Sequence, residues 1–234
     1  MNPSLETSQL LALLQLNDSA FPSGAFTHSY GLEQLVRQVV VRNASDVEHF
    51  VRSVLTHTIA TSEAVAARSG AEAAADGDLA SVLDLDRALY AMKPASELRG
   101  ASLMTGRRFL QEVAIHVESP MLSAYRERVA TDARLGNYAV AFGVVAAAHG
   151  IESRYVPAAV LLAAATAMLQ AAMRLMRVSH RDVQAILHRL RPLIAGLAAK
   201  VRAGARPVAL AGFHPLQDIA SMRHAGAEAR LFAS

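Results

Sequence analysis

The sequence predicts an all-α protein, a single compact domain of about nine or ten helices. Hydrophobic residues make up 53% of the 234 residues, whereas aromatic residues make up only 5%. Ala and Leu dominate this mixture, and both enter helices at little cost, whereas strands favour β-branched and aromatic residues. Apolar residues recur at helical spacing, and no segment alternates convincingly with a period of two. This apolar content also excludes a disordered chain.

The first helices are marked by apolar runs and by capping residues. Residues 8–16 are rich in Leu and end at a turn, after which a second helix is predicted to begin near Phe26. Ser45 and Glu48 form an S-x-x-E capping box, the signature of a helix start. Apolar residues follow at helical spacing, and the Ala-rich stretch from Gly70 to Gly77 is expected to loosen or end that helix.

Helix starts and breaks divide the middle of the chain. Asp78 can cap a helix, and Pro94 ends it because proline cannot continue the hydrogen-bond ladder. Ser96 then begins a segment that runs towards Pro120, and a further helix is predicted around 121–131.

Two nearly uncharged segments follow, about 138–149 and 157–176. Because small side chains let helices approach closely, both are predicted to pair at the centre of the fold. The stretch 155–173 is long enough to span a membrane. It is mostly Ala and contains Pro157, so a buried core helix is favoured and no membrane association is expected.

The last long helix is predicted over 181–199, with a kink or break at Pro192. Residues 1–212 are thus expected to form the helical domain, and residues 213–234 a polar, partner-binding tail. The tail has too few apolar residues for a core, so removing it should leave the helical body nearly intact. These residues are Phe213, Ile219, Leu231 and Phe232.

The chain offers no candidate for catalysis and no resident cofactor or metal site. It has no Cys, no G-x-x-x-x-G-K-[ST] loop and no H-E-x-x-H motif. The histidine pairs His49/His57 and His180/His188 are eight residues apart, too far along a helix to share one ion. No basic block with interleaved aromatic residues points to nucleic acid. The first residues do not resemble a signal peptide, so a cytoplasmic location is expected.

The most informative stretch is LLQLNDSAFPSGAFTHSYGLE at residues 13–33. Physically it is a helix, a Pro/Gly turn and a second helix. Such a corner serves either as a rigid support with Phe21 and Phe26 buried or as a binding surface, since loops often carry function.

This stretch closely resembles the opening motif of the UreF family, L-L-Q-x-x-D-S-x-x-P-x-G-x-[FY]-x-H-S-x-G-L-E. Later segments are also similar to that family, at 97–108, 141–151, 168–175 and 215–234. The chain departs from the family pattern at Asn137, Ala139, 178–180 and Ala233, where the family often has other residues.

The resemblance implies an all-helical accessory protein of urease that is not an enzyme. Such a protein pairs with UreD, called UreH in some species; the pair dimerises, recruits the GTPase UreG and docks on the urease apoprotein. Nickel is then handled by the assembled complex rather than held by this chain.

Two groups of partner-binding residues follow from the resemblance. The N-terminal group, near the GTPase, is Phe26, His28, Ser29 and Glu33. The C-terminal group, for UreD contact and dimerisation, is Arg223, His224, Arg230, Leu231 and Phe232. Arginine beside large apolar residues is typical of interface hot spots. For His28 a satisfied core position is an equal alternative, and for the tail the alternative is a frayed terminus.

Two other functions stay open at this point. The chain would activate the UreG GTPase directly if an arginine reached the nucleotide, and Arg174 and Arg177 are the candidates. Alternatively it would carry nickel weakly through His28, His214 or His224.

Overall fold

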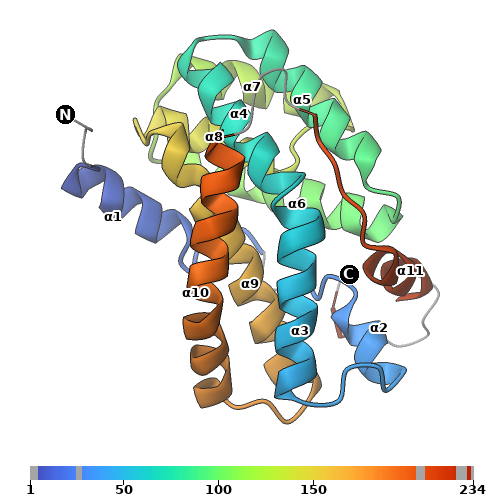
Figure 1. Ribbon diagram of the computed structural model, residues 1–234. Coiled ribbons are helices and arrows are strands. Elements are labelled where there is room, and N and C mark those ends of the chain that lie inside the picture. The colour runs from blue at the N-terminus through green and yellow to red at the C-terminus, as the bar shows by residue number, and fades with distance from the viewer. Residues whose placement is uncertain (1–4, 25–27, 204–208, 225–230, 233–234) are drawn as a thin grey trace.

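The computed structural model describes residues 5–24, 28–203, 209–224 and 231–232 (Figure 1). Within these ranges the chain forms eleven α-helices and no strand, which confirms the all-α prediction. The α-helices are α1 Thr7–Leu16, α2 Leu32–Arg37, α3 Ala44–Val54, α4 Glu63–Ala75, α5 Leu79–Met92, α6 Ser96–Val113, α7 Pro120–Thr131, α8 Tyr138–Ala148, α9 Val156–Leu175, α10 His180–Ala203 and α11 Pro215–His224. A π-helix, η2 Leu55–Ile59, extends α3, and a 3₁₀-helix, η3 Ser153–Tyr155, precedes α9.

The two uncharged helices lie in the core, as predicted, but they touch each other only slightly. The close partner of α8 is α4, which lies beside it in Figure 1. At Gly143 in α8, an added Cβ would lie 2.2 Å from the carbonyl oxygen of Ala67 in α4, so the two backbones nearly touch. The predicted pairing of 138–149 with 157–176 is therefore wrong, because Gly143 turns its open side to α4.

Replacing Gly143 by alanine is expected to lower the free energy of unfolding by about 1–3 kcal/mol, because α4 and α8 must separate to admit the methyl group. Gly196 in α10 is the matched control, since a Cβ there meets no atom within 4 Å. Gly196→Ala should stabilise the protein by up to about 1 kcal/mol. Urea unfolding of both variants measures this, and equal effects would contradict the close α4–α8 contact.

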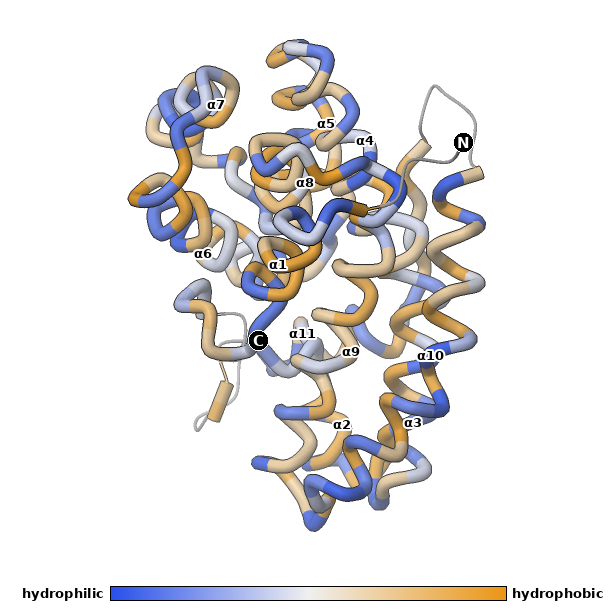
Figure 2. The backbone as a smooth tube through the Cα atoms, turned by 90° about the vertical axis from the view of Figure 1, so that its left-hand side faces the viewer, coloured by the Kyte–Doolittle hydropathy of each residue, from blue (hydrophilic) through white to orange (hydrophobic). Residues whose placement is uncertain are grey.

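The apolar helix α9 is a core helix. The segment Ser153–Leu175 has the length and composition of a membrane span, but 67% of its most apolar window is buried inside the protein. It packs against α2, α3, α4 and α10, which surround it in Figure 2. Helix α9 therefore has the composition of a membrane span because a helix that is apolar on all sides also suits a protein interior.

Several predicted helix ends are shifted. Asn43, not Ser45, caps α3, and its side chain accepts the Asp46 amide at 3.0 Å. The second helix begins at Leu32 rather than near Phe26, because Tyr30 and Gly31 adopt left-handed backbone angles (φ 55° and 84°). The predicted cap at Asp78 is confirmed by its hydrogen bond from the Ser81 amide.

One expected helix end is confirmed and one expected break is absent. Helix α4 continues through Gly70, against which Val140 of α8 packs, and ends at Ala75, inside the Gly70–Gly77 stretch. Helix α10, in contrast, continues through Pro192. Proline leaves the carbonyl four residues earlier, at His188, without its helical donor, and both positions are exposed, so water can satisfy that carbonyl.

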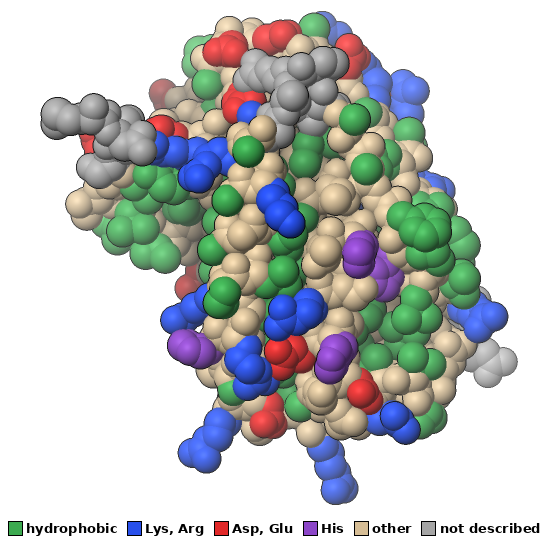
Figure 3. All heavy atoms as spheres, in the orientation of Figure 1, with side chains coloured by type: hydrophobic (Ala, Val, Ile, Leu, Met, Phe, Trp, Pro, Cys, Tyr) green, Lys and Arg blue, Asp and Glu red, His purple; other side chains and the backbone are tan. Residues whose placement is uncertain are grey.

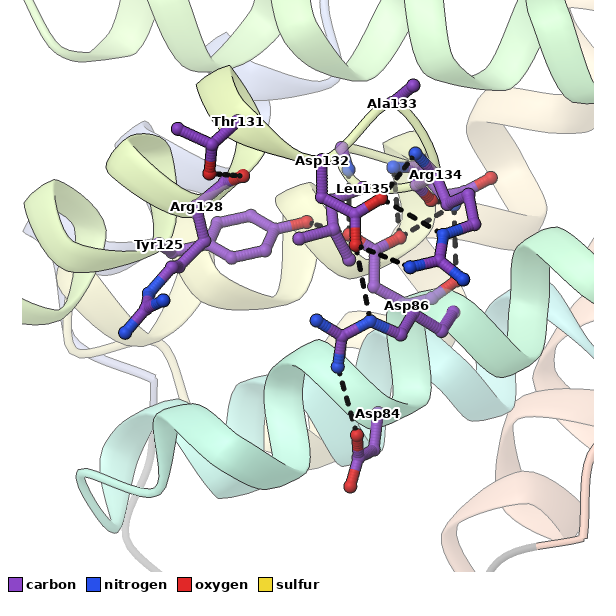
Figure 4. Close-up of polar contacts among 12 residues, drawn as sticks. Asp84, Asp86, Tyr125, Arg128, Thr131, Asp132, Ala133, Arg134 and Leu135 are labelled. Atoms are coloured by element: carbon purple, nitrogen blue, oxygen red, sulfur yellow. Dashed lines mark hydrogen bonds and ion pairs between the residues drawn. The ribbon is translucent and has the colours of Figure 1, made fainter.

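The loop between α7 and α8 is fixed by a buried carboxylate (Figure 4). Asp86 of α5 accepts hydrogen bonds from the Tyr125 hydroxyl, the Gly136 amide at 2.7 Å, and the amide and side chain of Asn137. Burial raises the pKa of Asp86, although these bonds oppose the rise. On the outside of the loop, Arg107 donates to three of its carbonyl groups. Asn137, a departure from the family pattern, is thus part of the loop's internal support.

Candidate functional site

The C-terminal segment is a packed part of the domain, contrary to the expectation of a separate polar tail. Helix α11 packs against α2 and α6. Ahead of it, the Ala211 amide donates to the carbonyl of Thr61 at 2.9 Å, and the Phe213 amide donates to the carbonyl of His57 at 3.1 Å. These contacts argue against the expectation that removing residues 213–234 leaves the helical body nearly intact. Among the described residues of this segment, the side chains of His214, Gln217 and His224 turn inward and find hydrogen-bond partners there.

The irregular turn at η2 creates the place where this segment binds. The amide of Thr61 donates to the carbonyl of Thr58 rather than to that of His57, four residues earlier. The carbonyl of His57 accepts the amide of Phe213 and also the hydroxyl of Thr61. The Thr58 hydroxyl also donates to the Gln217 side chain at 3.1 Å. Such π-turns inside helices are frequent at functional sites.

Glu33 of α2 is the centre of the docking contacts. Its side chain is fully buried, and it accepts the amides of Leu231 at 3.0 Å and Phe232 at 3.1 Å. It also accepts from His224 at 2.9 Å and from Arg37 at 2.7 Å. Burial by itself raises the pKa of a carboxyl group, but here the bonds from Leu231, His224 and Phe232 hold the pKa of Glu33 below its usual value. Glu33 is therefore ionised at neutral pH.

His224 links α11 to two other helices. Its Nε2 contacts Glu33 of α2, and its Nδ1 lies 2.8 Å from Oε2 of Glu97 in α6. Because both ring nitrogens face carboxylates, neither is directed at an external ligand. Among the described residues, no group of three or more His, Asp or Glu is arranged to hold a metal ion.

The other described members of the N-terminal group lie in the interior. His28 is buried, with Nε2 at 2.7 Å from the Thr105 hydroxyl. Burial, and then the charge of Arg108, lower the pKa of His28 to about 4, so the ring is neutral at pH 7. Ser29 is also fully buried. The surface role of this group stays a prediction, and Phe26 lies outside the described residues.

The outer face of α11 is apolar. Leu216, Ile219 and Met222 are each about half exposed, and Phe213 just before the helix is 80% exposed. Hydrophobic side chains gather at the right edge of Figure 3, over this helix. The arrangement is the reverse of an ordinary surface helix, because the buried face contains the polar side chains. We call these four residues the α11 outer face.

The remaining C-terminal candidates differ in position. Arg223 and Leu231 are exposed, the latter by 72%. Phe232 is buried, and the guanidinium group of Arg174 lies 5.8 Å from its ring centre. Arg230 lies outside the described residues.

Sequence reasoning missed most of the α11 outer face and the role of Glu97. The spacing of Phe213, Leu216, Ile219 and Met222, one apolar residue every three positions, was the available signal.

In comparisons of sequence, this chain is similar to proteins of a single family. The sequence model of the UreF family matches residues 41–191. A "Urease accessory protein UreF" from Yersinia enterocolitica (serotype O:8 / biotype 1B) is 32% identical over 231 residues, which cover 98% of this chain and all of that protein. The protein of the same name from Bacillus sp. (strain TB-90) is 29% identical over 97% of this chain and all of its own length. "Urease accessory protein UreF 2" of Brucella canis is 30% identical over 95% of this chain and 91% of its own length.

Proposed function

Because the chain belongs to the UreF family of urease accessory proteins, we propose that it is a non-catalytic cytoplasmic scaffold for nickel insertion into urease. In this role it binds UreD (UreH), pairs with a second copy of itself in the complex, recruits UreG and docks on the urease apoprotein. Nickel is the cargo of the assembly, and this chain supplies surfaces rather than ligands.

The α11 outer face is the observation that supports this proposal. The helix is attached from behind by polar contacts to Glu33, Glu97 and Thr58, so its apolar side chains remain for another protein. Contiguous exposed apolar side chains mark protein interaction sites. Arg223 follows Met222 directly and is exposed, so it adds the arginine that hot spots combine with apolar groups. We assign this face to UreD.

Placing a charge on the α11 outer face should break the complex. Ile219→Asp is expected to weaken UreD binding by about 2 kcal/mol or more, because the carboxylate would have to be desolvated at the centre of the interface. Co-purification with tagged UreD, followed by calorimetry, measures the loss.

The control is Ile115→Asp, since Ile115 is 69% exposed and lies outside α11. The control should bind UreD like the unchanged protein, and circular dichroism should show both variants folded. Unimpaired binding by folded Ile219→Asp would move the UreD surface away from α11.

A further inference from the structure

A cavity of about 110 Å³ lies beneath α11, enclosed by helices α5, α6 and α9. Its walls are mainly apolar. Small side chains on α9 leave the space open, and larger ones on α5 and α6 close its sides. The main wall residues are Leu89, Met92, Leu98, Ala101, Val160 and Ala164. A concave apolar space with a few polar groups is the usual form of a small-molecule site.

Three charged side chains line this cavity, and two of them form an ion pair with each other. Lys93 forms an ion pair with Glu63, and both side chains are largely buried. Asp218 of α11 also lines the cavity, yet among the described residues its carboxylate forms no ion pair or side-chain hydrogen bond. Burial, and more weakly the charge of Glu63, raise the pKa of Asp218, whereas the charges of His214 and Lys93 act to lower it. The three groups carry a net charge of minus one when ionised, and the ion pair of Lys93 is with Glu63 rather than with Asp218.

The histidines of the cavity do not compensate this charge. His214 accepts the Gln217 amide on Nδ1 at 3.1 Å, and its Nε2 lies 2.8 Å from the Ser53 hydroxyl. Burial lowers the pKa of both His214 and His28. Since both rings favour the neutral form, the cavity keeps its negative character.

We propose that this cavity binds a small organic cation, an alkylammonium or alkylguanidinium. The alkyl chain would lie along the alanines of α9, and the cationic group would pair with Asp218. An inorganic cation fits less well, because it needs several oxygen ligands in place of its water shell and the walls here are mainly apolar. This inference does not depend on the scaffold role and concerns a different face of α11.

The test uses n-butylammonium with the full-length chain, followed by calorimetry or saturation-transfer NMR. Saturable binding is expected, and uncharged butan-1-ol should bind about tenfold more weakly because it cannot pair with the carboxylate. Asp218→Asn, which keeps the shape and removes the charge, should weaken butylammonium binding by about the same factor.

Two further variants make the result specific. Ala164→Leu, which fills the cavity, should abolish binding, whereas Asp84→Asn removes a distant, 80% exposed carboxylate and should change nothing. The proposal is overturned by absence of saturable binding up to roughly 10 mM, by equal binding of butan-1-ol, or by unchanged binding in folded Asp218→Asn.

Discussion

Glu33→Ala is expected to lower the free energy of unfolding by about 3–5 kcal/mol, the usual loss when one member of a buried charged network is removed. The substitution leaves the amides of Leu231 and Phe232 and the ring of His224 without their acceptor. Each unsatisfied buried group adds its own desolvation penalty. Urea unfolding, with circular dichroism as the signal, measures the change.

The acid side of the stability profile provides a second readout of Glu33. Because its pKa is lower in the folded state than the ordinary value of 4.5, its stabilising contribution is complete above about pH 4.5. That contribution is lost as the pH falls from about 4.5 through the lowered pKa of Glu33. Over this pH interval, the free energy of unfolding should therefore fall less in Glu33→Ala than in the unchanged protein. The control is Glu127→Ala, an exposed position on α7 that should change stability by less than about 0.5 kcal/mol. Equal effects of the two variants would show that Glu33 does not secure the C-terminal segment.

Asp86→Ala should have the second largest effect, a loss of about 3 kcal/mol or more. The Tyr125 hydroxyl and the amides of Gly136 and Asn137 would lose their shared acceptor, and the loop that leads into α8 would lose its internal support. Thermal and urea unfolding measure this loss.

A neighbouring carboxylate serves as the control for Asp86. Asp84 lies two residues away on the same helix, but its side chain is 80% exposed, and among the described residues its one ion pair is with Arg87. Asp84→Ala should therefore be nearly neutral, because surface ion pairs contribute little. A similar loss in both variants would mean that the stability depends on the negative charge of α5 rather than on the buried hydrogen bonds of Asp86.

Local patterns predicted most of the helices but not their partners. The apolar spacing and the cap at Asp78 act within a few residues, so they can be recognised in the sequence. The contact of Gly143 with Ala67 depends on the relative orientation of two helices 76 positions apart, which no short pattern encodes. Asn43 and Ser45 are both good caps, and only the folded backbone selects between them.

The C-terminal segment was misjudged because its attachment is polar and long-range. Residues 213–234 contain few large apolar side chains, and most of those that the structure describes are exposed. Its binding comes instead from single hydrogen bonds to His57, Thr61 and Glu33. The motif resemblance did select Glu33 and His224, but it assigned them to external partners, whereas in the structure they contact each other.

The contact between Glu33 and the Phe232 amide joins residues 199 positions apart. At a synthesis rate of about 5–20 residues per second, Phe232 is added roughly 10–40 s after Glu33. Throughout that interval Glu33 has its local donor, Arg37, but the amides of Leu231 and Phe232 are not both present. The contacts that join α2 to the C-terminal segment therefore become possible only after nearly the whole chain has been synthesised.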